Sequence, residues 1–227
     1  MLVRVPDVLT KEELKQARSV LSAAQWVEGK VTAGAQSSGA KRNLQVPETS
    51  HEARQLGEII LTALGKNETF HAAALPFRVF PPLFNRYDAG MKFDAHVDNA
   101  IRHVRGANIR IRTDISATLF LSDPADYDGG ELLIEDTYGT QSIKLPAGHL
   151  VLYPATSLHR VAPIKKGARL ASFFWVQSMV KDDGKRRELF ELDMAIQETR
   201  AALGDSHHAS VALTAVYHNL LRRWSEL

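Results

Sequence analysis

Cysteine is absent from the 227-residue chain, which excludes disulfides, iron–sulfur ligation and thiol catalysis. Any metal chemistry must therefore use His, Asp and Glu. The chain also has no run of about 18 apolar residues, and its N-terminus has no apolar region followed by a small-residue cleavage site. We therefore expect a cytoplasmic protein with no membrane association. A formal net charge of +2 is too small to indicate a nucleic-acid partner.

Two amphipathic helices are predicted before residue 70. Thr10 and Glu13 have the spacing of a capping box, and apolar residues follow at helical intervals. Ser50 is placed to cap a second helix that ends at Gly65. Because each helix has one apolar face, we expect both to pack on the outside of a sheet.

The segment between these helices is small and polar. Gly29–Gly39 is rich in Gly and Ser and predicts a loop, with a role as a lid left open. For the residues that follow, 41–45, a solvated loop edge is favoured over a segment that projects into a site.

From about residue 70, short β-type runs are separated by Pro, Gly and Asp. The expected strands are 77–80, 83–87, 92–97, 115–121, 131–135, 141–145, 149–153, 159–162 and 169–177. Lys165-Lys166-Gly167 is interpreted as an exposed turn before the last of these strands. The pattern predicts a mainly β fold with flanking helices, in which a double-stranded β-helix (jelly roll) forms the core.

Helical periodicity returns near residue 182 and indicates two helices separated at Gly204. We place a boundary near Val180–Gly184. Residues 1–180 then form the jelly-roll domain with its N-terminal helices, and residues 181–227 form a small C-terminal helical subdomain. The apolar stripes of this subdomain need a partner, which is either the barrel or a second subunit.

The stretch around His96 carries the main indication of function. His96 and Asp98 stand two residues apart in an expected extended segment, so alternation points both side chains to one face, together with Asp94. A polar strand face is buried only where it lines a site. A third ligand is available in His159, 63 residues after His96. Two His and one carboxylate favour Fe(II) and leave three coordination positions open.

Arg169 begins the next expected strand, with Phe173 and Trp175 on its own face. An arginine that points among apolar neighbours into a barrel needs an anionic partner. Guanidinium suits the distal carboxylate of a dicarboxylate that chelates iron at its other end. Tyr87 is placed to offer a hydroxyl to such a carboxylate, although a lone tyrosine is more often a packed aromatic.

Residues 101–112 carry four arginines and no acid. One interpretation is a solvated loop. The other is that Arg102 and Arg105 flank the metal and select a negatively charged substrate. The segment has no aromatic residue to stack on bases, so nucleic acid is not expected.

Several motifs of the chain resemble those of the Fe(II)/2-oxoglutarate oxygenases of the prolyl-4-hydroxylase-like superfamily. They are Arg86-Tyr87, His96-Val97-Asp98-Asn99, Gly129-Gly130-Glu131-Leu132, residues 147–154, residues 157–161 and residues 167–171. Within that superfamily the N-terminal helices, Arg42-Asn43-Leu44-Gln45, residues 172–178 and the helical tail are similar to the bacterial PKHD-type hydroxylases, the iron-uptake factor PiuC group. The resemblance covers nearly the whole chain.

The resemblance implies iron bound by His96, Asp98 and His159, and 2-oxoglutarate held by Arg169 with help from Tyr87. It implies an enzyme that uses O₂ to couple decarboxylation of 2-oxoglutarate to succinate with hydroxylation of a substrate. Ascorbate as a reductant and a link to iron uptake or homeostasis are further expectations of the resemblance.

Three questions stay open at this point. The substrate is either a small molecule or a protein side chain, with an acidic group favoured. A homo-oligomer through the C-terminal helices is compatible with their apolar stripes. A non-catalytic jelly-roll module that binds metal or ligand is the alternative function, and nucleic-acid repair by the same chemistry is a third. A structural metal normally closes its coordination shell, which argues against the module.

Overall fold

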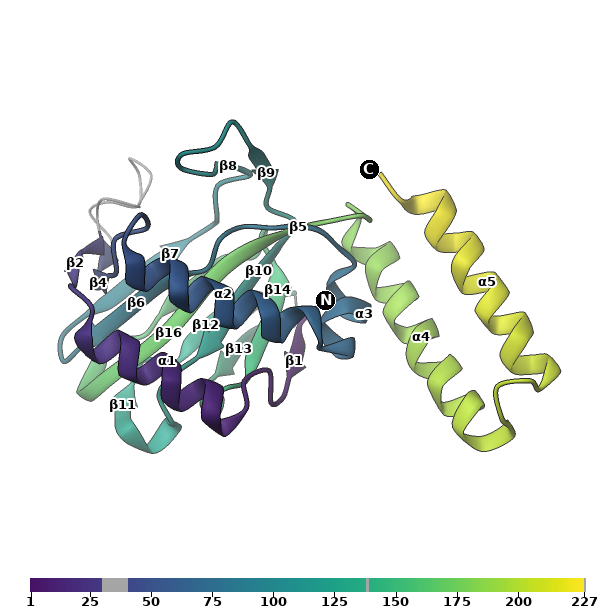
Figure 1. Cartoon of the computed structure of the whole chain (residues 1–227), viewed down its shortest axis with the longest axis horizontal. Helices are drawn as coiled ribbons and strands as arrows, with labels where there is room; N and C mark the ends of the chain where they lie inside the picture. Colours follow the sequence, from purple (N-terminus) through teal and green to yellow (C-terminus); the bar gives the residue numbers. More distant parts are fainter. Residues whose placement is uncertain (30–40, 138, 227) are drawn as a thin grey trace.

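The computed structural model describes residues 1–29, 41–137 and 139–226. Within these ranges the strands form two antiparallel sheets and a separate two-stranded ribbon (Figure 1). The larger sheet has the strand order β1-β14-β10-β16-β6-β4-β2, with β5 and β11 also paired to β16. The smaller sheet has the order β13-β12-β15-β7-β3. Two facing antiparallel sheets confirm the predicted jelly roll.

The strands of the larger sheet are β1 (Val3–Val5), β2 (Val27–Glu28), β4 (Leu44–Gln45), β5 (Pro76–Val79), β6 (Leu83–Asp88), β10 (Ile115–Phe120), β11 (Tyr127–Gly129), β14 (Leu150–Pro154) and β16 (Ile164–Ser178). Those of the smaller sheet are β3 (Lys41–Arg42), β7 (Lys92–His96), β12 (Leu132–Asp136), β13 (Gly139–Ile143) and β15 (His159–Val161). The ribbon consists of β8 (Ile101–His103) and β9 (Arg110–Arg112). Apart from Gly29, the predicted lid lies outside the described residues.

Helices α1 (Lys11–Ala23) and α2 (His51–Gly65) lie across the outer face of the larger sheet, as predicted (Figure 1). Thr10 and Glu13 form the expected capping box, and the Ser50 side chain accepts a hydrogen bond from the backbone N–H of Ala53 at 3.0 Å. A third helix, α3 (Glu68–Ala74), was not expected from the sequence. Its cap is Asn67, whose side-chain oxygen accepts from the N–H of Phe70 at 2.8 Å.

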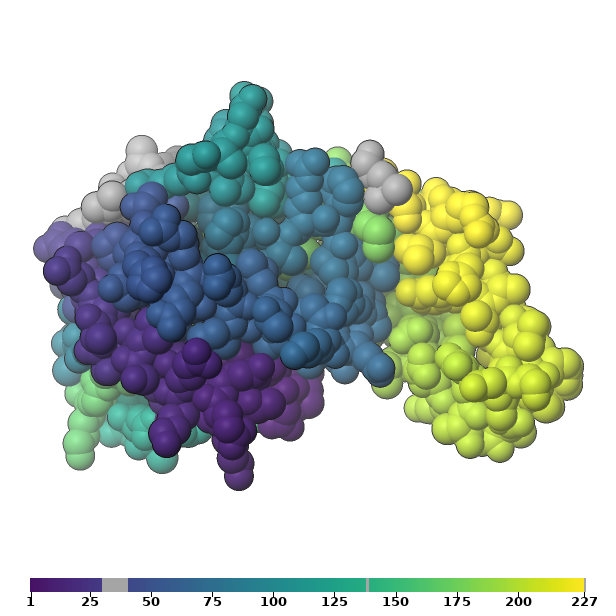
Figure 2. Space-filling model, viewed as in Figure 1, coloured from purple at the N-terminus to yellow at the C-terminus, as the bar shows by residue number. Residues whose placement is uncertain are grey.

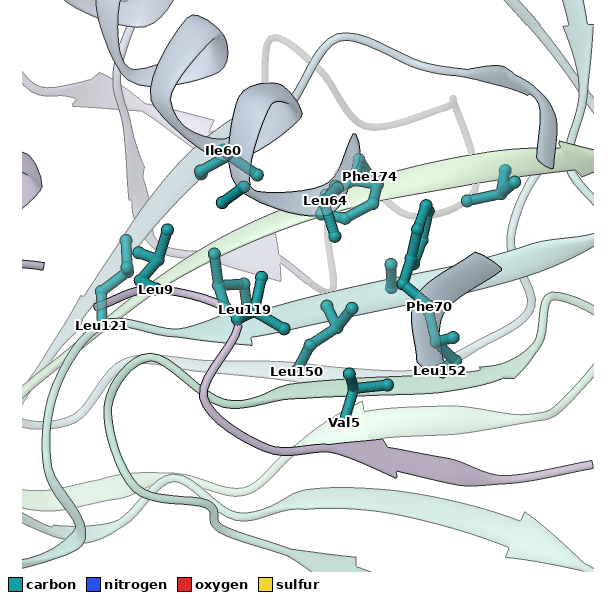
Figure 3. Close-up of a cluster of buried hydrophobic side chains, with 14 of the residues drawn as sticks. Val5, Leu9, Ile60, Leu64, Phe70, Leu119, Leu121, Leu150, Leu152 and Phe174 are labelled. Atoms are coloured by element: carbon teal, nitrogen blue, oxygen red, sulfur yellow. The ribbon is translucent and has the colours of Figure 1, made fainter. Parts of the chain in front are cut away.

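The main hydrophobic cluster fills the space between the helices and the larger sheet (Figure 3). Strand β10 shows how this cluster positions the opposite face of the sheet. All six residues of β10 are buried, and Ala117 and Leu119 pack towards the helices. Because side chains alternate across a strand, Ser116 and Thr118 face the space between the two sheets, where they line a cavity. Because Ala117 and Leu119 are fixed against the helices, Ser116 and Thr118 are the β10 side chains that point towards the cavity.

Lys165-Lys166-Gly167 is exposed, as predicted, but the predicted turn is wrong, because β16 is one strand of 15 residues from Ile164 to Ser178. The first part of β16 pairs with β11, with Gly167 opposite Tyr127. Gly167 has φ +77°, and a Cβ there would lie 2.1 Å from the carbonyl oxygen of Asp126. The glycine therefore allows close approach of two backbones within a strand and does not end it.

The two helices predicted after residue 182 are present as α4 (Asp183–Leu203), which ends at Gly204, and α5 (His208–Trp224). They form a hairpin that projects from one side of the β body (Figures 1 and 2). At the base of the hairpin Leu189 packs with Val180 and Leu75, and the aromatic rings of Tyr217 and Trp224 join them. None of the helices in the described residues is both long and apolar enough to cross a membrane.

Candidate metal and cosubstrate site

Neighbouring strands of the smaller sheet bring the two histidines together. His159 on β15 is paired with His96 on β7, and Val161 is paired with Phe93. Three residue steps on β7 therefore match two on β15, which is the signature of a bulge. The bulge places Phe93 and His96 on the same face, with their rings stacked at a centroid distance of 3.7 Å. Both residues line the cavity between the sheets.

The simple alternation expected for this strand is therefore wrong in part. It placed Asp94 on the face of His96 and Phe93 on the opposite one. The Asp94 carboxylate instead lies 2.7 Å from the ammonium of Lys92 and is 48% exposed. The bulge separates Asp94 from the cavity, whereas Asp98, which follows the end of β7, enters it.

His96, Asp98 and His159 form a cluster in which one potential ligand atom from each lies within 4.8 Å of the others. The carboxylate oxygens of Asp98 lie 3.9 Å from Nε2 of His96 and 3.7 Å from Nε2 of His159. Carboxylate and imidazole on one side of a cavity are the donor set that suits non-haem Fe(II). The predicted trio is thus brought together with a geometry that can hold one metal ion.

Hydrogen bonds to the backbone fix the orientation of both imidazoles. Nδ1 of His96 donates to the carbonyl of Asp94 at 2.9 Å, and Nδ1 of His159 donates to the carbonyl of Ser157 at 3.0 Å. A carbonyl only accepts, so each ring carries its proton on Nδ1 and leaves Nε2 free for a metal. The third potential ligand is held in a similar way, because the Ser116 hydroxyl donates to Asp98 Oδ2 at 2.6 Å.

The protonation state of His96 also suits metal binding. Burial, with a smaller contribution from the neighbouring His159, lowers the pKa of His96 to about 4. The imidazole is therefore neutral at physiological pH, as a ligand must be.

Arg169 lies in the same cavity and is 1% exposed. Its guanidinium carbon lies 5.6 Å from the centroid of the Tyr87 ring and 5.2 Å from that of Phe120. Among the described residues, no hydrogen-bond acceptor reaches Nε or Nη1. A buried cation with free donors requires an anion, and a carboxylate of 2-oxoglutarate meets that requirement. The residues present therefore fit this cosubstrate.

Tyr87 adjoins Arg169 in the sheet, since β6 and β16 pair these two residues. Burial raises the pKa of Tyr87 to about 12, against the opposing effect of the Arg169 charge. The hydroxyl consequently keeps its proton and can donate to a bound carboxylate. Tyr153, whose ring centroid lies 5.1 Å from that of His159, is also protonated because burial raises its pKa.

The arginine-rich segment is a two-stranded ribbon that projects from the β body (Figures 1 and 2), and most of its residues are exposed. Arg102 and Arg105, which the sequence analysis assigned one shared role, lie in different environments. Arg102 lines the cavity, with its guanidinium carbon 4.2 Å from the Trp175 ring centroid. Arg105 is 55% exposed and lies 3.3 Å from the Glu48 carboxylate.

Lys41 is one of the cavity residues that sequence reasoning missed, together with Ser116 and Tyr153. The solvated loop edge favoured for residues 41–45 is wrong, because Lys41 is 4% exposed, Asn43 4% and Gln45 3%. Strand β3 pairs with β7, which brings Lys41 opposite Phe93. Residues 41–45 show no alternation of apolar with polar side chains, so the sequence carried no signal that Lys41, Asn43 and Gln45 face inward.

Comparison with known proteins agrees with this geometry. Residues 82–177 match the family model described as the 2OG-Fe(II) oxygenase superfamily. Residues 183–226 match the model of the PKHD-type hydroxylase C-terminal domain. The first match contains His96, Asp98, His159 and Arg169, and the second covers both helices of the projecting hairpin.

Full-length relatives are known. The chain is 64% identical over 227 residues to a PKHD-type hydroxylase of Gluconobacter oxydans and 59% identical over 228 residues to one of Cupriavidus metallidurans, with 100% of each chain covered in both cases. Among solved structures, a prolyl hydroxylase from Trichoplax adhaerens superimposes with a TM-score of 0.54 at 14% identity, over 83% of this chain and 86% of the other. The structural likeness supports the jelly-roll fold. The chain belongs to the PKHD-type hydroxylases and is a dioxygenase of the 2OG-Fe(II) oxygenase superfamily, with iron and 2-oxoglutarate as its cofactor and cosubstrate.

Proposed function

We propose that His96, Asp98 and His159 hold the iron, and that Arg169 with Tyr87 holds 2-oxoglutarate. The observation that carries the proposal is the position of Arg169, a buried cation with two free donors in the cavity that also contains the ligand trio. The trio alone suits any metal that prefers imidazole and carboxylate. The additional buried arginine explains why a dicarboxylate would bind beside that metal.

The bound groups supply the oxidation itself, in which one oxygen atom of O₂ enters succinate and the other enters a C–H bond of the substrate. The protein positions the metal-binding atoms and keeps water away from the reacting centre. Ser116 and the two backbone carbonyls orient the metal-binding atoms before a metal arrives. Leu132 and Val161 line the same cavity and limit water near the reacting centre.

The test is succinate formation from 2-oxoglutarate by the purified chain in the presence of Fe(II) and O₂. Asp98→Ala should abolish succinate formation. The matched control is Asp94→Ala, which removes an exposed carboxylate four residues earlier and leaves intact the carbonyl that orients His96. The assignment fails if Asp98→Ala retains turnover, and a wild-type chain that binds metal but forms no succinate would indicate a non-catalytic module.

Further expectations are part of the same proposal. We place the enzyme in the cytoplasm, with ascorbate as the reductant that restores Fe(II) and with a role in iron uptake or homeostasis. The division into residues 1–180 and 181–227 is supported by the start of α4 at Asp183.

Contact with a second copy through the hairpin is also part of the proposal. It is supported by four exposed apolar side chains, which are Met194 and Leu203 on α4 and Val211 and Val216 on α5. Light scattering with Val211→Ser tests that contact, because the dimer should dissociate.

A further inference from the structure

Arg102 occupies an unusual environment for a surface ribbon. Its guanidinium carbon lies 4.2 Å from the Trp175 ring centroid and 5.3 Å from that of Phe80. Within the described part of the chain, no hydrogen bond or ion pair within 4.0 Å is formed by the Arg102 guanidinium, although the charges of Glu48 and Asp98 act on it. Aromatic contacts hold the planar group in place while leaving its N–H donors available to the cavity.

Lys41 supplies a second cation to the same wall. Its ammonium lies 5.3 Å from the Phe93 ring centroid and 5.5 Å from that of Phe173. Burial and the positive charge of Arg102 together lower the pKa of Lys41 to about 8, against the opposing effect of the Asp98 and Glu48 charges, so the two cations are close enough to repel. Two cations held together in a partly buried wall are stabilised when an anion binds between them.

The acids near this wall have contacts of their own. Asp98 accepts a hydrogen bond from Ser116 and belongs to the cluster of proposed metal ligands, while the Glu48 carboxylate is 10% exposed and lies 3.3 Å from Arg105. The charges of both acids also act on Lys41 and Arg102. Arg102 and Lys41 line the cavity that a substrate would enter.

We propose that Arg102 and Lys41 form the binding site for a carboxylate of the substrate, so that the enzyme hydroxylates a C–H bond a short distance from that carboxylate. This inference rests on the proposed function, because it takes the neighbouring metal as the oxidising centre. The guanidinium accepts a carboxylate side-on through two N–H groups. The rings of Phe93, Phe173 and Trp175 then contact the carbon skeleton.

The burial of Lys41 restricts how the carboxylate arrives. Only 4% of Lys41 is exposed, so the acid must enter the cavity at the end of a slender chain. A free carboxylic acid and the side chain of an Asp or Glu in a peptide share this chemistry. The two kinds of acid differ in the part of the molecule that remains outside the cavity. A binding experiment can therefore distinguish a free acid from a peptide side chain.

The experiment measures binding to the full-length chain loaded with Zn(II), which does not support turnover, and saturated with 2-oxoglutarate. The probes are matched pairs that differ only in charge: hexanoate against hexanamide, benzoate against benzamide, and a capped Asp peptide against its Asn counterpart. Ligand-observed NMR or calorimetry gives each affinity. We expect at least one acid to bind about tenfold or more tightly than its amide, which corresponds to one charge-assisted hydrogen bond.

The variants assign that preference to the proposed residues. Arg102→Gln should remove it, while Arg102→Lys, which keeps the charge, should retain part of it. Arg110→Gln is the matched control, since Arg110 is an exposed arginine of the same ribbon that does not line this cavity. Thermal unfolding of each variant shows that the fold is retained.

The outcomes are distinct. Acid preference among the free acids, or only among the peptides, supports the site and identifies the source of the carboxylate. Equal affinity or equal absence of binding for acid and amide in every pair overturns it, as does an unchanged preference in Arg102→Gln. Because zinc-loaded protein is used, these results do not depend on the succinate assay, which tests the proposed function separately.

Discussion

Replacement of Arg169 by Met should have opposite effects on the ligand-free protein and on cosubstrate binding. The Arg169 side chain is 1% exposed and packs against Tyr87 and Phe120, while Nε and Nη1 have no hydrogen-bond partner among the described residues. Met has a similar length and fills the space without a charge. An unpaired buried charge is replaced by an apolar group, so the free energy of unfolding should rise by about 1–3 kcal/mol.

The same substitution removes the anchor of the 2-oxoglutarate carboxylate. Truncation of one partner of a buried, hydrogen-bonded charge pair costs about 2–5 kcal/mol in binding. The dissociation constant of 2-oxoglutarate should therefore rise about thirtyfold to several thousandfold. Metal affinity should remain within about threefold, because Arg169 is not one of the three clustered ligands.

Urea unfolding with and without 2-oxoglutarate, together with calorimetry on the Zn(II)-loaded protein, measures all three quantities. Arg160→Met is the matched control, since Arg160 follows His159 in the chain and is exposed; it should alter none of them. A less stable Arg169→Met protein with unchanged cosubstrate affinity would refute the reasoning. Parallel loss of metal and 2-oxoglutarate binding would also contradict it, because Arg169 would then shape the whole site.

Three further predictions follow from individual contacts. Ser116→Ala removes the 2.6 Å hydrogen bond to Asp98 and should weaken Zn(II) binding about tenfold or more in competition with a chelator; unchanged affinity would show that Asp98 needs no such support. The folded state holds the pKa of His96 near 4, below its ordinary 6.5, so between these values the unfolded chain binds more protons and stability is lost as pH falls. The metal-free protein should lose about 2 kcal/mol from this group between pH 7 and pH 5, and urea unfolding of His96→Gln should show a correspondingly weaker pH dependence; equal slopes would contradict the assignment. Gly167→Ala should lower the free energy of unfolding by about 2 kcal/mol or more, since the residue has φ +77° and a Cβ would meet the Asp126 carbonyl; an unchanged unfolding midpoint would show that the two backbones separate at no cost.

The sequence predicted the ligand trio and Arg169 because metal and anion chemistry restrict residue types more strongly than local structure does. It did not predict the burial of Lys41, because only the long-range pairing of β3 with β7 turns this residue into the cavity. The bulge opposite His159 is likewise a property of two strands together, and it reverses the expected faces of Phe93 and Asp94. Lys165-Lys166-Gly167 was interpreted as a turn because glycine is common in turns, although here Gly167 permits β11 to approach β16.

Helix α3 was missed for a different reason. Its seven residues are too few to establish a helical period in the sequence. The N-cap at Asn67 was the available signal, since its side chain accepts the N–H of Phe70. The longer helices α1 and α2 were predicted because their caps and apolar stripes agree.

The central claim is that one ferrous ion and one 2-oxoglutarate bind together in the cavity formed by His96, Asp98, His159 and Arg169. Anaerobic titration of the purified chain with Fe(II) and 2-oxoglutarate measures this directly, through the visible charge-transfer absorption that a keto acid shows when it chelates iron. We expect the absorption to saturate at one Fe(II) per chain in the wild type and to be absent in His159→Ala. An absorption of equal strength and stoichiometry in His159→Ala, or none in the wild type, would contradict the account.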